Sequence, residues 1–424
     1  MSERPVLVVG AGLAGLSAAI ELAQAGIAVV VVDQAQAPGG AVHRQPLTGV
    51  RSVASAMQAR RWAAVMAGVQ AQGAAITIRC GTRFGGVDHT GAVLLTGAMA
   101  ALIRPRALVL AVGASERVQP RPGWTLPGVQ TAGAIQTRIK TLAEAPSGRV
   151  LLAGSGPLLL AVGAELCRIG RPPEAIIETA RPLRPLAALG LPLPYLTEAA
   201  GYLARLFLAR VPLLWGAHLT RIETGNTGLL AHVETRRGAQ TFTADLIGLH
   251  DGIRPNDTGL TDSKALPVLR LGDCREALGA RAALADGQAG GAALAAKLLG
   301  RAAPPPSSEL NRQRAAQARL AQIYTHDGAT RLADMPDDTV ICRCENRTLA
   351  DLRALGTAPT DRELRLDGRF AMGACQGRFC AEWVGRITAP TQLRQRIGAA
   401  RWPASPINIA DLLAALDTLE GETK

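Results

Sequence analysis

Val6-Leu7-Val8-Val9 runs directly into Gly10-Ala11-Gly12-Leu13-Ala14-Gly15, and this stretch decides the fold. The first four residues are a short apolar run that predicts a buried strand. Helix-forming residues 16–23 follow, and a second apolar run, residues 27–32, ends in Asp33. Strand, glycine turn, helix, strand and acid together make one βαβ unit, which is typical of dinucleotide binding.

Each glycine of the turn has its own expected task. Gly10 permits the tight turn, Gly12 lets the backbone approach a pyrophosphate, and Gly15 lets helix and strand pack closely. The N-terminus of the helix then faces the phosphate charge. Asp33 can accept hydrogen bonds from a ribose, so these four residues are predicted to bind the cofactor.

A Gly-Gly pair follows the acid. Gly39 and Gly40 suit a loop whose backbone passes close to the cofactor, and Arg44 lies just beyond them. A simple turn is the alternative interpretation of the pair. We predict that Gly39, Gly40 and Arg44 also bind the cofactor.

Length and composition set limits on the architecture. With 424 residues, of which 48% are hydrophobic, the chain should form two or three domains and is not disordered. No apolar run is long enough to span a membrane, and the N-terminus leads straight into the first strand without room for a signal peptide. We therefore expect a cytoplasmic protein.

The formal net charge is +12. An arginine-rich solvated surface, an acidic partner protein and an anionic membrane surface all fit this charge, so peripheral association with the cytoplasmic face of a membrane stays open. Nucleic acid is disfavoured because the arginines are scattered and no known binding motif accompanies them.

After a helix expected over residues 52–72, the pattern changes to short strands. Alternating stretches near residues 75–79, 82–87, 92–96 and 101–104 predict a small antiparallel meander. Residues 107–112 predict one more buried strand, which runs into Gly113.

Residues 1–300 resemble the FAD/NAD-linked disulfide oxidoreductase-like flavoproteins. The resemblance implies an α/β fold with two dinucleotide-binding domains, in which the strand before Gly113 closes the FAD domain. It also implies that a late Gly-Asp pair, Gly272-Asp273 here, holds the ribityl chain of FAD. The FAD domain would then be discontinuous, formed by residues 1–125 and 255–302. The redox-active pair of cysteines two residues apart is missing, which disfavours disulfide reduction.

A second nucleotide-type unit lies between those halves, over residues 126–254. A strand at residues 149–153 leads into the turn at Gly154 and Gly156, and a later strand ends at Glu178. Leu159 stands at the third glycine position, where it should crowd helix against strand. Gly154, Gly156 and Glu178 are candidates for holding NAD(P) or another adenine nucleotide, and an empty fold is an equal alternative.

Residues 303–335 are predicted to be a linker and a helix. Pro304-Pro305-Pro306-Ser307-Ser308 marks the linker, and residues 309–324 predict a polar, arginine-rich helix that spans between domains.

Four cysteines cluster near the C-terminus. Cys342 and Cys344 are separated by one residue, and Cys375 and Cys380 by four. Four thiolates in a short segment indicate a metal site. Zinc is the alternative, although its cysteine pairs usually have two to four residues between them. The pattern resembles the bacterioferritin-associated-ferredoxin-like 2Fe-2S domain, which implies a small helical domain over residues 336–395 with all four cysteines as ligands, followed by a C-terminal tail, residues 396–424.

Three further segments narrow the resemblance: residues 113–117, residues 122–129 and the Gly-Ser-Gly-Pro-Leu-Leu turn at 154–159. Together with the cysteine pattern they look like the α (A) subunits of heteromeric flavin-dependent amino-acid and opine dehydrogenases, of the opine oxidase, D-hydroxyproline dehydrogenase and hydrogen cyanide synthase type. The resemblance implies that a D-amino-acid-oxidase-like β subunit oxidises the C–N bond and that the α subunit relays electrons. It leaves room for a small γ subunit and for a further flavin shared with the partner.

FAD and a 2Fe-2S cluster in one chain would convert two-electron into one-electron transfer, because a flavin exchanges two electrons or one and the cluster carries one. Two other classes stay open. One is a self-sufficient NAD(P)H-dependent reductase that feeds an iron–sulfur acceptor, and the other is a structural subunit whose FAD is off the electron path. No acid–base or nucleophile constellation stands out, so the sequence indicates no catalytic residue.

Overall fold

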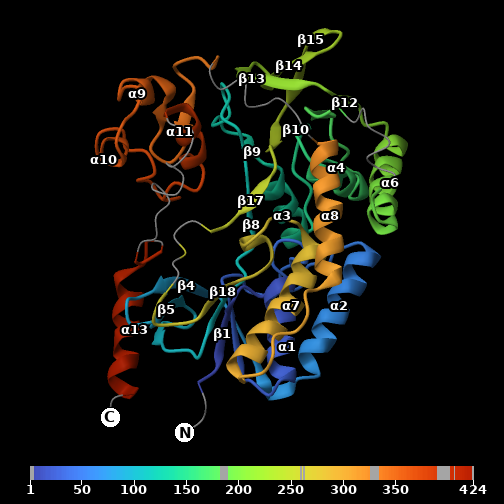
Figure 1. Ribbon diagram of the computed structural model, residues 1–424. Coiled ribbons are helices and arrows are strands. Elements are labelled where there is room, and N and C mark those ends of the chain that lie inside the picture. Colours follow the sequence, from blue (N-terminus) through green and yellow to red (C-terminus); the bar gives the residue numbers. More distant parts are fainter. Residues whose placement is uncertain are drawn as a thin grey trace. The chain divides into compact units, whose positions relative to one another are not determined.

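The structure is a computed structural model that describes residues 4–181, 190–257, 260, 263–324, 334–388, 402–404 and 406–422 (Figure 1). It divides into two compact units, which are described separately. Unit 1 contains Met1–Ser115, Arg254–Ala315 and Ala400–Lys424, and unit 2 contains Glu116–Ile253 and Ala316–Ala399. Both units combine helices with parallel sheets, which confirms the predicted α/β fold class. The finer domain limits stay a prediction.

Unit 1 is built on a five-stranded parallel sheet. Its strands are, in spatial order, β18 (Val268–Arg270), β7 (Leu108–Leu110), β1 (Val6–Val9), β2 (Val29–Asp33) and β3 (Ile76–Cys80). Three helices of the unit contribute to the same core: α1 (Leu13–Gln24), α2 (Ala56–Gln70) and α7 (Ala280–Leu298). A parallel sheet must be covered on both faces, which explains why its central strands β7 and β1 are apolar throughout.

The alternation of side chains along β1 shows how the two faces are covered. Val6 and Val8 pack with α1, α2 and α7, whereas Leu7 and Val9 pack on the opposite side with a second sheet. That second sheet is antiparallel and consists of β4 (Thr82–Val87), β5 (Val93–Gly97) and β6 (Ala101–Ile103). Unit 1 therefore has three layers, with the parallel sheet in the middle.

The predicted four-stranded meander is wrong in one respect. Its first stretch forms β3, which pairs in parallel with β2, Val31 opposite Ile78, and so extends the parallel sheet. Only β4, β5 and β6 form the antiparallel sheet. The preceding helix α2 returns the chain to the start of the sheet, which is the crossover that a parallel neighbour requires.

Small residues allow α1 and α7 to lie side by side (Figure 1). A Cβ atom on Gly287 would lie 2.3 Å from the Ala14 carbonyl oxygen, and one on Gly291 would lie 2.7 Å from Ala18 Cα. The glycine- and alanine-rich composition of α7 therefore serves close helix packing. This packing brings the start of α7 next to the first turn of α1.

The segment predicted only as a C-terminal tail contains α13 (Ile409–Glu422). In Figure 1 this helix, drawn in red, lies beside β4 and β5. Ala415 is buried with Leu94 and Leu102, and Leu102 N–H donates to Thr418 Oγ1 over 3.1 Å. The chain thus returns to unit 1 after leaving it.

Unit 2 repeats the layered plan. Its parallel sheet has the order β12 (Leu213–Trp215), β11 (Ala175–Glu178), β10 (Val150–Gly154), β16 (Leu246–His250) and β9 (Val129–Thr131). One face packs against the antiparallel strands β13 (His218–Gly225), β14 (Gly228–Thr235) and β15 (Gly238–Ala244). The helices of this part of the unit are α3 (Ala132–Leu142), α4 (Pro157–Arg168) and α6 (Leu193–Leu208).

Three elements lie where the chain passes between the units. They are β8 (Ala114–Glu116), β17 (Ile253–Pro255) and the helix α8 (Ser308–Ile323). The bounds of α8 confirm the predicted helix over residues 309–324 to within one residue at each end.

The cysteine-rich part of unit 2 has a small core of its own. Its elements are β19 (Val340–Cys342), β20 (Arg347–Thr348), α9 (Leu349–Arg353), α10 (Asp361–Leu366) and α11 (Ala381–Thr388). Phe370 and Leu364 are fully buried within it. Trp124 Nε1 donates to the Val340 carbonyl oxygen over 2.7 Å, which ties this core to the rest of unit 2.

Candidate functional site

The predicted cofactor residues of unit 1 converge at one edge of its parallel sheet. Gly10, Asp33, Gly113 and Gly272 lie at or just beyond the carboxyl ends of β1, β2, β7 and β18. The four strands are parallel and adjacent, so their carboxyl ends share one edge. In open α/β sheets, ligands bind outside this edge.

The three glycines of the first turn differ in what surrounds them. Gly10 has φ +106°, and a Cβ there would lie 2.4 Å from the Ala111 carbonyl oxygen. A Cβ on Gly15 would lie 1.9 Å from the carbonyl oxygen of Gly10. Gly12 is different, because its φ is −84° and the nearest atom to its Cβ position is Gly40 Cα at 3.8 Å. Gly10 and Gly15 are thus required by the fold, whereas Gly12 faces free space at the N-terminus of α1.

The Gly-Gly loop is held against this turn. Gly39 N–H donates to the Ala11 carbonyl oxygen over 2.8 Å. Gly40 has φ +61°, and a Cβ on it would approach Gly12 Cα to 3.1 Å. The loop therefore lines the same space as Gly12, as the cofactor interpretation of the pair requires.

Two charged side chains belong to this turn and to the segment after the Gly-Gly loop. Asp33 accepts hydrogen bonds from Ala11 N–H over 2.7 Å and from Ala35 N–H over 2.8 Å, which fixes the orientation of its carboxylate. Arg44 has a buried Nε that makes no hydrogen bond among the described residues. A buried guanidinium nitrogen without an acceptor there suits a phosphate oxygen, so the residues present fit the pyrophosphate of a dinucleotide.

The Gly272-Asp273 corner lies next to α1. Gly272 has φ +64°, and a Cβ there would lie 2.6 Å from Ala14 Cβ. Asp273 Oδ1 accepts from Leu278 N–H over 3.0 Å and from Gly279 N–H over 2.7 Å, and burial raises the pKa of this carboxyl. Gly113 has φ +71° with no atom within 4 Å of its Cβ position, so it leaves the edge of the sheet open.

The second glycine turn is packed differently. A Cβ on Gly154 would lie 1.8 Å from the His250 carbonyl oxygen, so this glycine is needed for the strand pairing. Leu159 is fully buried, yet α4 begins normally at Pro157. The close approach of helix to strand occurs one turn later, where a Cβ on Gly163 would lie 2.6 Å from Ile176 Cδ1. The expected crowding at Leu159 therefore does not prevent the fold.

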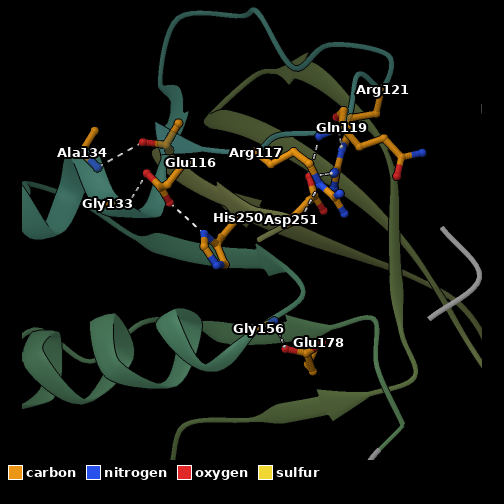
Figure 2. Close-up of polar contacts among 11 residues, drawn as sticks. Glu116, Arg117, Gln119, Arg121, Gly133, Ala134, Gly156, Glu178, His250 and Asp251 are labelled. Atoms are coloured by element: carbon orange, nitrogen blue, oxygen red, sulfur yellow. Dashed lines mark hydrogen bonds and ion pairs between the residues drawn. The ribbon is translucent and has the colours of Figure 1, made fainter. Parts of the chain in front are cut away.

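Glu178 differs from its counterpart Asp33 in being completely buried. Its carboxylate accepts from Gly156 N–H over 3.0 Å and from Ala180 N–H over 2.8 Å, as Figure 2 shows for Gly156. Burial raises the pKa of Glu178 to about 7, although both backbone hydrogen bonds oppose that rise.

This raised pKa predicts a pH-dependent stability. The folded-state pKa lies above the ordinary value of 4.5, so the stabilisation is complete below about pH 4.5 and is lost as the pH rises through about 7. We expect wild type to lose about 3 kcal/mol of unfolding free energy across this window, and Glu178→Gln to lose much less. Thermal unfolding midpoints of both proteins, measured from pH 4.5 to 8, test this.

Asp245→Asn is the matched control for this measurement. A hydrogen bond from Arg149 lowers the pKa of Asp245 to about 2, so this carboxylate stays ionised throughout the window. Its variant should differ from wild type by the same amount at every pH. If the difference between the midpoints of Glu178→Gln and wild type is the same at every pH instead of changing through about pH 7, Glu178 has an ordinary pKa.

Two neighbours of the second turn are not evident from the local sequence. His250 ends β16, and Glu116 ends β8; their side chains approach each other, with Nδ1 of His250 2.9 Å from Glu116 Oε1 (Figure 2). The placement of His250 follows from the pairing of β16 with β10, and Glu116 comes from β8, which belongs to another sheet; both are long-range features of the fold.

The four clustered cysteines approach as two pairs. Cys342 and Cys380 are hydrogen-bonded through their side chains, and so are Cys344 and Cys375. The bond from Cys380 lowers the pKa of Cys342 to about 6, and the pKa of Cys380 is raised because it keeps that proton. Backbone N–H groups of Cys344, Glu345 and Ala371 also donate to the Cys342 sulfur.

The backbone around these thiols is unusual. Non-glycine residues with left-handed φ occur here in a group: Asn346, Arg369, Ala371 and Gln376, with φ between 50° and 61°. Such residues cost energy and cluster at functional sites. In addition, a Cβ on Gly373 would lie 2.3 Å from Cys344 Cβ, so only glycine fits there.

The described part of the chain contains neither a site for a single metal ion nor a helix that could span a membrane. No three Cys, His, Asp or Glu side chains converge closely enough there to hold a single metal ion. None of its helices combines the length and apolar character needed to cross a bilayer.

Comparison with known proteins gives a consistent picture. Residues 4–274 match the family model of the pyridine nucleotide-disulphide oxidoreductases. Hydrogen cyanide synthase subunit HcnB of Pseudomonas aeruginosa is 32% identical, with 96% of this chain and 97% of that protein covered. The A subunit of opine oxidase of Rhizobium meliloti is 30% identical, with 92% and 93% covered.

Among solved structures, L-proline dehydrogenase from P. horikoshii has a similar fold. The TM-score is 0.61 at 17% identity, over 97% of this chain and 79% of that one. The predicted resemblance is thereby confirmed: the chain belongs to the pyridine nucleotide-disulphide oxidoreductase family and is similar over nearly its whole length to the A subunit of opine oxidase and to hydrogen cyanide synthase subunit HcnB.

Proposed function

We propose that this oxidoreductase is the FAD- and 2Fe-2S-containing electron-transfer subunit of a heteromeric dehydrogenase for amines or imino acids, such as opines or D-hydroxyproline. It would relay electrons from a substrate-oxidising subunit to an acceptor. The observation that carries the proposal is the presence in one chain of a dinucleotide-type glycine turn and two pairs of cysteine thiols. The names of both relatives describe subunits, which supports a partner-dependent role.

FAD would be held by unit 1. The pyrophosphate would approach Gly12 and Gly40, with Arg44 as its cationic contact, and Asp33 would hold the ribose. Asp273 would hold the ribityl chain. The remaining glycines, Gly10, Gly15, Gly39, Gly113 and Gly272, shape the backbone around it. When bound, FAD accepts two electrons and can release them singly.

The 2Fe-2S cluster would be held by the two cysteine pairs. Each iron of a dinuclear cluster takes two thiolates, so two pairs suit it better than a single ion that needs three or four converging ligands. The N–H groups aimed at Cys342 would stabilise the negative charge of the thiolate, and hydrogen bonds to sulfur are one means of tuning the potential. We retain residues 336–395 as the proposed limits of this domain.

The proposed partner is a D-amino-acid-oxidase-like β subunit that carries the substrate site. The isolated chain should therefore not oxidise proline derivatives, glycine or opines. Co-expressed with such a β subunit, it should form a stable complex that reduces an artificial dye with one of these amines. A screen of amines with the purified complex, monitored by dye absorbance, tests this. Comparable amine oxidation by the isolated chain would refute the subunit role.

Within that complex, Cys375→Ser should separate the two half-reactions. Substrate should still reduce the partner's flavin, because that site lies in another chain, whereas transfer to downstream acceptors should be lost. Cys80→Ser is the control, since Cys80 is half-buried in β3, outside the cysteine cluster.

The two alternative functions would give different results in such experiments. Rapid bleaching of FAD by NAD(P)H alone favours a self-sufficient reductase, and FAD that stays oxidised during turnover favours a structural subunit.

A further inference from the structure

Two arginines hold one buried carboxylate next to the cysteine cluster. Glu382 lies two residues after Cys380, in the first turn of α11, and its side chain is only 9% exposed. Its Oε1 is 3.4 Å from Nη1 of Arg117 and 2.9 Å from Nη2 of Arg386. Two guanidinium groups and one carboxylate leave an excess of one positive charge in this triad.

Trp383, the next residue of α11, holds both guanidinium groups in place. The central carbon of each group lies over its ring, 5.8 Å from the ring centroid for Arg117 and 5.2 Å for Arg386. The ring is 3% exposed and packs in the same buried cluster as Cys342 and Cys380. A cation is attracted more strongly to a ring that is desolvated. The positive charge is therefore kept beside a side chain that packs with two of the four thiols.

Arg117 comes from outside the cysteine-rich core, from the segment just after β8. Its N–H donates to the Gly252 carbonyl oxygen, and its own carbonyl oxygen accepts from Asp251 N–H, both over 2.9 Å. Its Nε donates to the Asp251 carbonyl oxygen over 3.0 Å, and Figure 2 shows the two residues side by side. These bonds fix both the backbone and the guanidinium group of Arg117, so it brings a charge of defined position to α11.

Other arginines of the cysteine-rich core are in one-to-one pairs. Arg347 lies 3.1 Å from Asp351, and Arg369 lies 3.1 Å from Glu345. Opposite charges so close together largely cancel at a distance. The triad differs, because its two guanidinium groups share one carboxylate among the described residues.

We infer that the triad of Arg117, Glu382 and Arg386 raises the reduction potential of the proposed 2Fe-2S cluster. The inference rests on the proposed function, which places that cluster on the four cysteines. An added electron makes a thiolate-ligated cluster more negative, so an excess of positive charge nearby stabilises the reduced form. Arg386 is six residues beyond Cys380, about 9 Å along the helix, and one unit charge at that distance changes the reduction equilibrium about tenfold.

Redox titration of wild type and variants, followed by the electron paramagnetic resonance signal of the reduced cluster, tests the inference. Arg117→Gln should lower the midpoint potential by the equivalent of about a tenfold change, which is about 59 mV for a one-electron couple. Glu382→Gln removes the negative charge and should raise the potential by a similar amount. The opposite signs are decisive, because a triad that only holds the core together gives no reason for them.

Three further variants isolate the charge. Arg386→Gln removes the second cation and should lower the potential as Arg117→Gln does. Arg117→Lys keeps the charge and should restore most of the wild-type potential. Arg221→Gln is the matched control, because Arg221 is paired with Glu223 over 2.7 Å on the β13–β14 hairpin, outside the cysteine-rich core; its potential should equal that of wild type.

Iron and sulfide content, measured on the same preparations, reports on the proposed cluster separately. Wild type without iron and sulfide would refute the cluster and the inference together. Variants that contain the cluster but have the wild-type potential, or whose potentials all shift in one direction, would overturn the inference alone. If Glu382→Gln loses its iron, the two arginine variants and the lysine rescue still decide the question.

Discussion

Wild-type protein prepared anaerobically should contain about two irons and two acid-labile sulfides per chain, and Cys344→Ser should contain almost none. Iron held by thiolates is lost when one ligand becomes a hydroxyl, because serine does not ionise near neutral pH and is a harder donor than sulfur. Cys344 is the exposed member of the four, so its replacement changes the ligand set without disturbing the small core. Iron and sulfide assays, with the visible spectrum, measure the effect.

The two buried ligands should give the same loss of iron with an added cost in stability. Cys342 and Cys380 belong to the core that includes Leu349 and Phe370, so a serine in either place also buries a hydroxyl among apolar side chains. We expect Cys342→Ser and Cys380→Ser to lose the cluster and unfold at lower temperature. FAD content should remain, because the FAD residues lie in unit 1.

Cys80→Ser provides the matched control and should keep its iron, sulfide and FAD. Stoichiometric zinc without sulfide in wild type would refute the 2Fe-2S assignment and favour a structural zinc site. Iron retained at wild-type level in all of the cluster variants would show that other residues hold it.

Local sequence predicted the strand–turn–helix units around both glycine turns, for a physical reason. The contacts that define the first turn stay within one βαβ unit: Asp33 bonds to Ala11, and Gly15 packs on Gly10. Their spacing alone constrains the geometry. Cys342 and Cys344 lie at and just beyond the end of β19, but their partners Cys380 and Cys375 come from more than thirty residues away, which the spacing alone does not reveal.

Features set by distant parts of the chain were not predictable in this way. The strand pattern of β3 is the same whether its neighbour is parallel or antiparallel, and only the crossover helix α2 decides between them. The apolar residues of α13 are explained only by the tertiary structure, in which Ala415 packs in one buried cluster with Leu102. His250 belongs to the second turn because β16 lies beside β10, which no local pattern around Leu249-His250-Asp251 reveals.

Gly12→Val should abolish FAD binding while leaving the fold largely intact. Gly12 has an ordinary φ of −84°, and the nearest atom to its Cβ position is Gly40 Cα at 3.8 Å, so the substitution strains neither the backbone nor a close contact. The branched side chain would instead fill the space where a pyrophosphate must approach the N-terminus of α1. We expect FAD content, measured by absorbance after denaturation, to fall more than about tenfold, since that backbone approach is lost entirely.

Three comparisons make this prediction specific. Gly15→Ala should fail to fold properly, because its Cβ would lie 1.9 Å from the carbonyl oxygen of Gly10. Gly113→Ala introduces a methyl group at the same sheet edge with no atom within 4 Å, although its φ of +71° carries a moderate strain, and it should retain more FAD than Gly12→Val. Asp273→Ala should weaken FAD binding without blocking it. Colourless wild-type protein that cannot be reconstituted with FAD, or a Gly12→Val protein as yellow as wild type, would contradict the assignment of this turn as the flavin site.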